Sequence, residues 1–229
     1  MKISVLVIVQ FILSVSLYAQ KDVTQFLGIP VDGNKYEMIN KLRDKGYVAN
    51  PDDKNLLDGK FNGTEVTIYV ATNNNKVWRI MVSDVNPISE IDIKIRFNKL
   101  CQQFQNNEKY ISASLSNSDF SIPEDENISY EISVNKRRYE ASFFQKPLEL
   151  DTTAMKKELQ DILLKKYTNE QLSNPTEEEY KDMVMTGTSF MYEKFSKKSV
   201  WFMIKELYGK YFIIMYYDNE YNSANGEDL

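Results

Sequence analysis

Residues 64–83 read TEVTIYVATNNNKVWRIMVS. On both sides of three consecutive asparagines, β-branched and aromatic residues alternate with polar ones, which is the period of a half-buried strand. Asparagine tolerates positive φ and closes turns with its own side chain, so Asn73-Asn74-Asn75 predicts the turn of an antiparallel hairpin. An isolated hairpin is only marginally stable in water. This one therefore requires further strands or helices that cover one of its faces.

Two amphipathic segments beside this hairpin supply such cover. The spacing of apolar residues predicts one helix over 34–46, which ends at Gly46, and another over 89–107, which begins at Ser89. The second helix has a continuous apolar stripe, which consists of Ile93, Phe97, Leu100, Cys101 and Phe104.

The C-terminal section shows the same combination with longer helices. Helical patterns cover 153–167 and about 176–197, and the second of these opens with a capping box of Thr176 and Glu179. Both have apolar residues at helical spacing, so both are expected to pack against a sheet.

Two further hairpins are expected. One covers 129–145, where Tyr130, Ile132 and Val134 alternate with polar residues. The other covers 199–217 and turns at Tyr208-Gly209-Lys210; its strands are continuously apolar, which is typical of strands covered on both faces.

The order of a helix followed by a hairpin therefore occurs three times along the chain. It predicts an α+β fold, an antiparallel sheet built of hairpins with amphipathic helices packed on one face, arranged as one sheet or as two tandem modules. We divide the chain into a helix-plus-sheet module over 24–147 and a second helix-plus-hairpin module over 150–217, packed on the first. The polar tail over 218–229 is expected to be frayed.

The opening of the first module carries a resemblance. The motifs are FLGIPVDG at 26–33, a short helix ending in KGY at 45–47, and DGKFNG at 58–63 before a strand. Together they resemble small secreted proteins of unknown function from anaerobic Gram-negative gut bacteria. The resemblance covers about 26–147; it implies a compartment and a comparable fold, and no catalytic role. In element order alone, the tandem modules resemble the beta-lactamase-inhibitor-protein and outer-membrane assembly lipoprotein architectures, and such a likeness does not give function.

Residues 1–19 have the layout of a bacterial secretory signal peptide. Lys2 provides the positive start, 3–17 form an apolar core, and Leu17-Tyr18-Ala19 offers a cleavage site before Gln20. The alternative is a retained membrane anchor, but this core is shorter than the span of about 20 residues that a membrane helix needs. We therefore expect a periplasmic or secreted protein with no membrane span after signal removal.

Composition excludes several classes of function. The chain of 229 residues contains no histidine and one cysteine. Without histidine there is no Ser–His or Cys–His nucleophile pair and no His-ligated metal. Cys101 cannot form an intramolecular disulfide, and we interpret it as a core residue because a reactive thiolate needs a base or cation beside it. The net charge of −5 argues against nucleic acid as a partner.

Paired carboxylates are the acid–base system that remains. The candidate acids are Glu65, Asp84, Glu124, Asp125 and Glu126. Two carboxyl groups, one of them in an apolar setting, could cleave a glycosidic bond, so a glycan hydrolase is the alternative reading. The acids at 52–58 and at 124–126 do not follow a calcium-binding loop pattern, and we predict no metal site and no cofactor.

Aromatic residues give the best hint of a binding surface. Trp78 and Trp201 each lie on a hairpin strand, where they either pack in the core or stack on sugar rings. Tyrosines, which are enriched at protein interfaces, crowd the last hairpin. The predicted binding residues are Tyr208, Tyr211, Tyr216, Tyr217 and Tyr221. We thus predict a non-catalytic secreted or periplasmic module, not an enzyme, that binds a protein or a cell-envelope component through its sheet or this hairpin.

Overall fold

The computed structural model describes residues 22–113, 120–148, 151–224 and 226. The predicted signal peptide and its cleavage site lie outside these residues. Within the described part of the chain, no helix is both long and apolar enough to cross a membrane.

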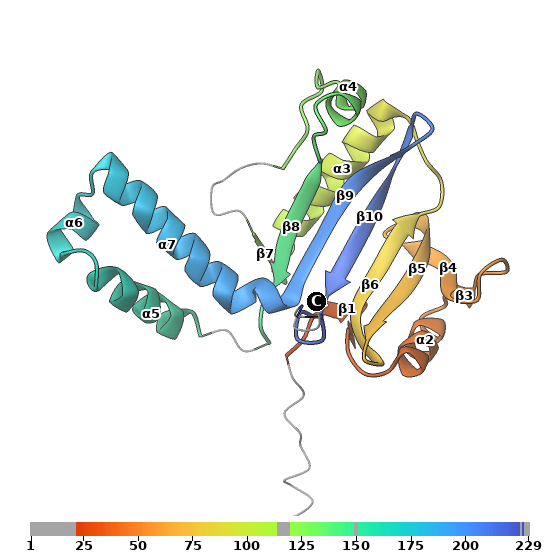
Figure 1. Cartoon of the computed structure of the whole chain (residues 1–229), viewed down its shortest axis with the longest axis horizontal. Helices are drawn as coiled ribbons and strands as arrows, with labels where there is room; N and C mark the ends of the chain where they lie inside the picture. Colours follow the sequence, from red (N-terminus) through yellow and green to blue (C-terminus); the bar gives the residue numbers. More distant parts are fainter. Residues whose placement is uncertain (1–21, 114–119, 149–150, 225, 227–229) are drawn as a thin grey trace, which may run out of the picture.

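One eight-stranded sheet forms the centre of the molecule, and all of its neighbouring strands are antiparallel (Figure 1). The α+β class and the antiparallel sheet are confirmed. In spatial order the strands are β3 (Val48–Ala49), β4 (Leu56–Phe61), β5 (Thr64–Asn73), β6 (Lys76–Asp84), β10 (Lys210–Asp218), β9 (Ser199–Leu207), β8 (Glu140–Gln145) and β7 (Tyr110–Ser112).

The predicted asparagine hairpin is formed by β5 and β6. Asn74 and Asn75 occupy its turn with φ of 47° and 60°. Positive φ at both central residues is the geometry whose twist suits a tight hairpin, and asparagine tolerates it. The first hairpin prediction is therefore confirmed, with Asn73 at the end of β5 and paired with Lys76 rather than in the turn.

Each half of the sheet is a helix followed by a four-stranded meander. Helix α2 (Lys35–Asp44) precedes β3 to β6, and helix α3 (Glu90–Gln105) precedes β7 to β10. The two meanders meet at the β6–β10 pair, so the strand order is symmetric about the centre of the sheet. The sequence predicts three helix-plus-hairpin units, whereas the sheet contains two helix-plus-meander units. The difference arises because the last hairpin, β9 and β10, completes the second meander.

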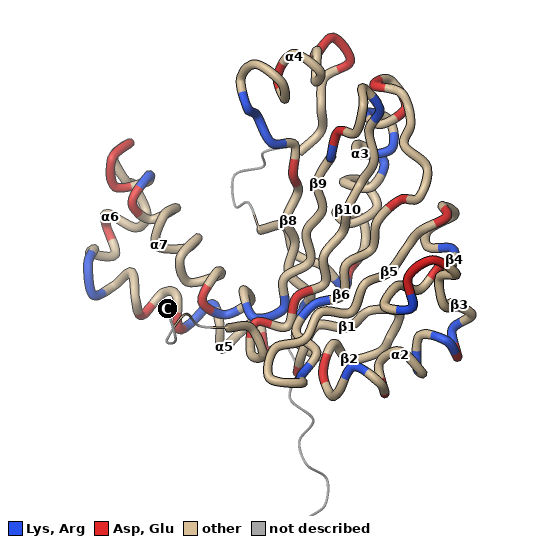
Figure 2. Tube along the Cα trace, turned by 45° about the vertical axis from the view of Figure 1, so that its right-hand side comes forward, with Lys and Arg blue, Asp and Glu red and all other residues tan. Residues whose placement is uncertain are grey.

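The main core lies between the sheet and these two helices. Met38 and Leu42 of α2 and the apolar stripe of α3 are buried against alternate residues of the strands. One row of strand residues facing the helices runs across six strands and is buried throughout; it consists of Leu57, Ile68, Val82, Met215, Phe202 and Ala141. Charged residues are few in the middle of the sheet (Figure 2).

The hairpin predicted before Pro147 is wrong in its first strand. Ile128–Ser133 forms a short helix, α4, whose first turn is capped by the side chain of Asn127 through the backbone N–H of Tyr130. The sequence alternates, but Ile128 and Ile132, four residues apart, are the pair that packs on the core. Burial therefore favoured the helical period over the strand period.

A helical arm is inserted between β8 and β9. It contains α5 (Thr152–Leu164), α6 (Asn169–Ser173) and α7 (Glu177–Phe195), followed by the 3-10 turn η1 (Ser196–Lys198). Thr176 and Glu179 form the predicted capping box. The arm extends away from the sheet (Figure 1), and its buried residues, Phe190 and Phe195, lie toward its base. These helices thus add little cover to the sheet.

The start of the tail is ordered, contrary to the expectation of fraying. Asp218 still belongs to β10, and Asn219 is completely buried. The Asn219 side chain donates to the carbonyl of Val31 at 2.7 Å, and Asn222 donates to Asp32 at 2.8 Å. These contacts attach the end of β10 to the segment after the short pair β1 (Gln25–Phe26) and β2 (Ile29–Pro30).

Gly59 allows the ring of Tyr47 to lie against β4. A Cβ atom at Gly59 would lie 2.4 Å from Cδ1 of Tyr47, a residue that is itself buried. We expect Gly59→Ala to lower the free energy of unfolding by about 1–3 kcal/mol through overpacking, as measured by urea denaturation. The matched control introduces the same change beside Tyr47→Leu, where the clash is relieved. An equal loss in both backgrounds would contradict the steric explanation.

Candidate functional site

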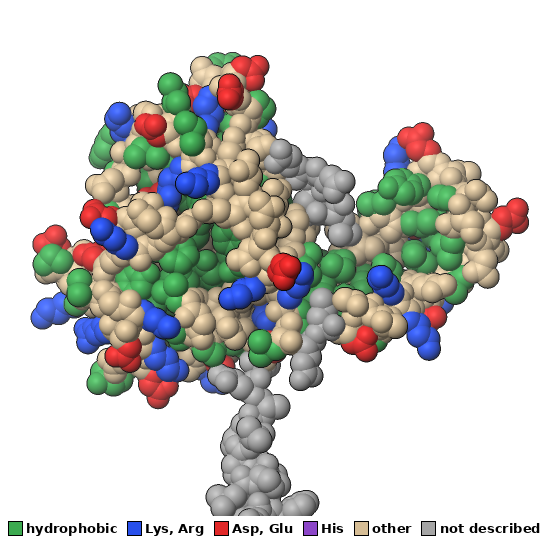
Figure 3. All heavy atoms as spheres, turned by 180° about the vertical axis from the view of Figure 1, so that it is seen from behind, with side chains coloured by type: hydrophobic (Ala, Val, Ile, Leu, Met, Phe, Trp, Pro, Cys, Tyr) green, Lys and Arg blue, Asp and Glu red, His purple; other side chains and the backbone are tan. Residues whose placement is uncertain are grey.

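Three adjoining cavities lie on the helix-covered side of the sheet, two along α3 and the third beyond its C-terminal end, and we name them together the α3 groove. The central cavity has a volume of about 340 Å³. It shares Asn62, Leu100 and Gln103 with a cavity of about 390 Å³, the Lys99 cavity. On its other side it adjoins a cavity of about 560 Å³, the Lys146 cavity. Figure 3 shows the hollow, with hydrophobic side chains at its bottom and basic side chains around it.

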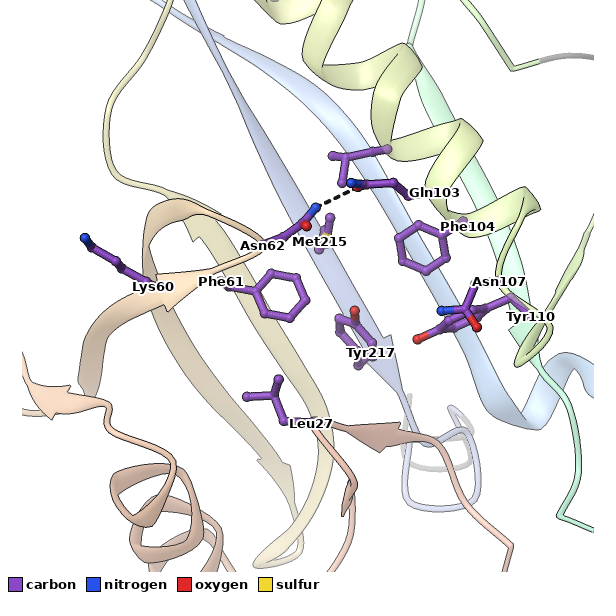
Figure 4. A pocket seen from close by; sticks show the side chains of 11 residues that line it. Leu27, Lys60, Phe61, Asn62, Gln103, Phe104, Asn107, Tyr110, Met215 and Tyr217 are labelled. Atoms are coloured by element: carbon purple, nitrogen blue, oxygen red, sulfur yellow. Dashed lines mark hydrogen bonds between the residues drawn. The ribbon is translucent and has the colours of Figure 1, made fainter.

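The bottom of the central cavity is apolar and comes from four separate segments. Met215 and Tyr217 are alternate residues of β10, and Phe104 lies on the apolar stripe of α3. Phe61 ends β4, and Leu27 lies in the turn between β1 and β2 (Figure 4). Leu27 has a φ of 53° and is 38% exposed. A leucine at positive φ is unusual, and here it places an apolar side chain at the cavity mouth.

Two tyrosine hydroxyls meet at the edge of the central cavity. Burial raises the pKa of Tyr217 and of Tyr110, and a hydrogen bond between the two hydroxyls raises the pKa of Tyr217 further. Gln145, which also lines the Lys146 cavity, donates to the Tyr110 hydroxyl at 3.4 Å and to the carbonyl of Gln25 at 2.6 Å. The site therefore holds neutral, protonated phenols at physiological pH.

These raised pKa values predict a loss of stability at alkaline pH. The unfolded chain releases the two phenolic protons near the ordinary tyrosine pKa of 10.0, whereas the folded protein retains them above it. Their contribution is complete below pH 10 and is lost as the pH rises beyond it. We expect the urea midpoint to decline above about pH 10, and to decline less steeply in Tyr217→Phe. An unchanged slope in that variant would contradict the assignment.

A side-chain bridge crosses the groove between the central cavity and the Lys99 cavity. The Asn62 amide donates to Oε1 of Gln103 at 2.8 Å (Figure 4). Asn62 lies in the turn between β4 and β5 with a φ of 49°, and Gln103 lies on the exposed side of α3. The amides of Asn62, Gln103 and Asn107 thus offer donors and acceptors along the wall.

Basic side chains outnumber acidic ones along the groove. The three cavities are lined by six basic and two acidic residues, which are Lys60, Arg96, Lys99, Lys109, Lys146 and Lys198, with Asp92 and Glu108. Arg96 is bound to Asp84 and Lys198 to Asp22. The other four lysines form no ion pair within the described residues. The groove is thus locally positive in a chain whose net charge is −5.

The candidate carboxylates are scattered. Asp84 binds Arg96 and accepts from the backbone N–H of Ile213 at 3.1 Å. Glu126 is bound by Arg137 and Tyr139. Glu65, Glu124 and Asp125 are exposed. None of the three cavities of the groove, nor the apolar cavity at the base of the arm, is lined by two carboxylates.

The predicted tyrosine surface is not a single surface. Tyr211 and Tyr217 are buried because they point from β10 toward the helices. Tyr208 is 96% exposed in the hairpin turn, and Tyr221 is partly exposed beyond the opposite end of β10. Tyr216 lies on the other face of the sheet. Among the five, Tyr217 lines the groove.

The face of the sheet opposite to α2 and α3 carries an aromatic stack. The guanidinium of Arg79 lies 4.2 Å from the ring centroid of Trp78 and 4.8 Å from that of Tyr216. Tyr216 stacks on Trp201 with 4.0 Å between centroids. Asp218 accepts from Arg79 at 2.6 and 2.7 Å and from Nε1 of Trp201 at 2.9 Å. Both tryptophans are half-buried and contact protein groups, so the stack connects β6, β9 and β10.

Two further sequence predictions concern the role of Cys101 and metal binding. Cys101 is buried on the apolar stripe of α3. Within the residues that the structure describes, no group of three or more Cys, Asp or Glu side chains is placed to hold a metal ion.

Most residues of the groove were not predicted from the sequence. Phe61, Asn62, Gln103 and Lys109 are not among the residues that the sequence predicted to bind. One local signal was available, since Leu27-Gly28 places a large apolar residue in a turn, where polar residues are expected. Comparison of the chain with models of protein families, with curated proteins and with solved structures finds no match. The function is therefore argued from the geometry.

Proposed function

We propose that this protein is a non-catalytic binding module of the periplasm or the cell exterior, and that the α3 groove holds its ligand. The observation that carries the proposal is that the three cavities adjoin one another, along α3 and past its C-terminal end, over an apolar floor. A concave, largely apolar site with a few convergent polar groups is the usual form of a ligand pocket. The partner is a protein or a cell-envelope component.

Several features of the site support binding rather than chemistry. Apart from Lys60, the polar groups of the central cavity are phenols and amides, which are neutral at physiological pH and suit recognition. A glycosidase needs two carboxyl groups about 5–9.5 Å apart, and no cavity described above has such a pair. No observation favours the glycan hydrolase, so it is not carried further.

The proposal is tested by filling the groove without disturbing the core. Gln103 is exposed on the groove wall, and Gln105 is exposed on the same helix but lines none of the three cavities. Gln103→Trp should obstruct the groove, whereas Gln105→Trp is the matched control. Partners are captured from envelope extract with the protein lacking residues 1–19, then purified and titrated by calorimetry.

We expect the wild type and Gln105→Trp to bind the purified partner alike, and Gln103→Trp to bind it at least about tenfold more weakly. Circular dichroism and thermal unfolding of all three proteins establish that each is folded. Equal affinity of the two tryptophan variants would refute the groove as the binding site.

A further inference from the structure

The distribution of charge along the α3 groove selects among ligand classes. Lys99 is exposed in one terminal cavity, Lys109 and Lys146 line the other, and Lys60 lines the central cavity, whose floor is apolar. Each terminal cavity also contains one acid, but basic residues outnumber it: Arg96 and Lys99 lie with Asp92, and Lys109, Lys146 and Lys198 lie with Glu108. A ligand that is apolar in its middle and anionic at both ends matches this pattern.

The apolar centre disfavours a sugar ring. Leu27, Phe61 and Phe104 surround the central cavity together with Leu100 and Met215. A sugar carries hydroxyls around its whole edge, and those that face these apolar side chains would be buried without a partner, which costs free energy. An apolar peptide side chain fills the same space without that cost and gains from burial.

The walls can serve a peptide backbone. The amides of Asn62, Gln103 and Asn107 lie along the groove; Asn62 donates to Gln103, and Oδ1 of Asn107 accepts from the backbone N–H of Lys109 at 3.0 Å, so Asn107 offers its NH2 group as a donor. An extended peptide presents one N–H and one C=O at each residue, so these amides can pair with it on either side of the anchor. The hydrogen bond between Asn62 and Gln103 would open as the chain passes between the turn and α3.

The length of the groove determines how many ligand residues separate the apolar side chain from the anionic groups. Its α3 wall runs from Arg96 to Gln105, which is about 14 Å at the helical rise of about 1.5 Å per residue, and the Lys146 cavity lies beyond that end. An extended chain covers the α3 wall in about four residues at roughly 3.3 Å each. An anchor in the central cavity would then have a carboxylate about two residues away on each side.

We propose that the α3 groove binds an extended acidic segment of a partner protein, with one large apolar side chain in the central cavity and a carboxylate in each terminal cavity. This inference rests on the proposed function and specifies its ligand. Apolar burial in the centre supplies affinity, and the lysines at the ends supply orientation and selection against basic segments.

The test is a fluorescence-anisotropy titration with synthetic peptides. The probe has the sequence Gly-Ser-Glu-Ser-Phe-Ser-Glu-Ser-Gly; its controls replace both Glu by Gln, both Glu by Lys, or Phe by Ala. We expect the acidic probe to bind at least about tenfold more tightly than each control, and its affinity to fall between 50 and 300 mM salt. Indistinguishable affinities of the Glu and Gln peptides would overturn the acidic assignment.

A charge-reversal variant examines the same inference from the protein side. Lys109→Glu/Lys146→Glu should weaken the acidic probe about tenfold or more and make the Lys peptide the better ligand. The matched control is Lys156→Glu/Lys157→Glu on the arm, which makes the same change of charge away from the groove and should leave both affinities unchanged. A similar loss in both double variants would attribute the effect to net charge and overturn the proposal.

The failure of this inference is distinguishable from the failure of the proposed function. Titration with an oligogalacturonate tests the other anionic polymer class. If the wild type binds it, Gln103→Trp does not and no peptide binds, the groove is a ligand site but the peptide assignment is wrong. If Gln103→Trp retains the purified envelope partner with the affinity of Gln105→Trp, the groove itself is refuted.

Discussion

Phe202→Ala should lower the free energy of unfolding by about 3–5 kcal/mol, the range for truncating a fully buried phenylalanine. Phe202 is completely buried on the helix-facing side of β9. Its ring centroid lies 5.3 Å from that of Phe97, 5.5 Å from Phe104 and 6.1 Å from Phe143. The side chain thus joins α3 to two strands of the second meander, and its loss leaves a cavity that three rings border.

Phe212→Ala is the matched control for Phe202→Ala. Phe212 lies on β10 and is only half-buried, so the same atoms are removed with less burial lost. Urea denaturation monitored by circular dichroism gives both free energies. We expect the Phe212 variant to lose clearly less than the Phe202 variant. Comparable losses would mean that the rings around Phe202 collapse into the space it leaves.

Asp218→Ala should lower the free energy of unfolding by about 3 kcal/mol. Asp218 is 2% exposed and accepts three hydrogen bonds, two from Arg79 and one from Trp201. Its removal leaves a largely buried guanidinium without a counter-charge, which costs about 3–5 kcal/mol in fully buried pairs. The side chain of Arg79 is 24% exposed, so water offsets part of that loss and the lower end is expected.

Two further variants test whether the lost stability of Asp218→Ala comes from breaking the buried ion pair or from the removal of a charge alone. Glu140→Ala breaks the exposed pair with Arg138, for which a cost of 0–1 kcal/mol is typical. The double variant Arg79→Leu/Asp218→Leu removes both charges together and should recover much of the stability that Asp218→Ala loses. If the double variant is less stable than Asp218→Ala, the aromatic stacking of Arg79 outweighs its ion pair.

Local patterns explain why the first hairpin could be predicted and α4 could not. The asparagines at 74 and 75 carry the backbone preference of the turn within two residues, so no distant contact is needed. At 128–133 the same sequence satisfies a strand period and a helical period. The helical conformation is favoured by the burial of Ile128 and Ile132 and by Glu90, whose carboxylate accepts from the N–H of Ile128 at 2.9 Å.

The tyrosine prediction shows the same limit at the candidate site. Counting aromatic residues on the last hairpin identified Tyr217, but the side to which each residue points depends on the register with β6 and β9. Strand alternation sends Tyr211 and Tyr217 toward the helices and Tyr216 to the other face. The exposed Tyr208 and Tyr221 therefore lie far from a common surface, beyond opposite ends of β10.

The amino-acid sequence by itself determined the helix caps, the asparagine turn and the antiparallel, α+β character of the chain, because each depends on residues within a few positions of one another. It also removed imidazole chemistry, since histidine is absent. Only the tertiary structure decided that β6 pairs with β10 and that Leu27, Phe61, Gln103 and Tyr217 border one groove. Those contacts join segments up to about 190 residues apart, and their formation depends on the packing of the whole core rather than on any local preference.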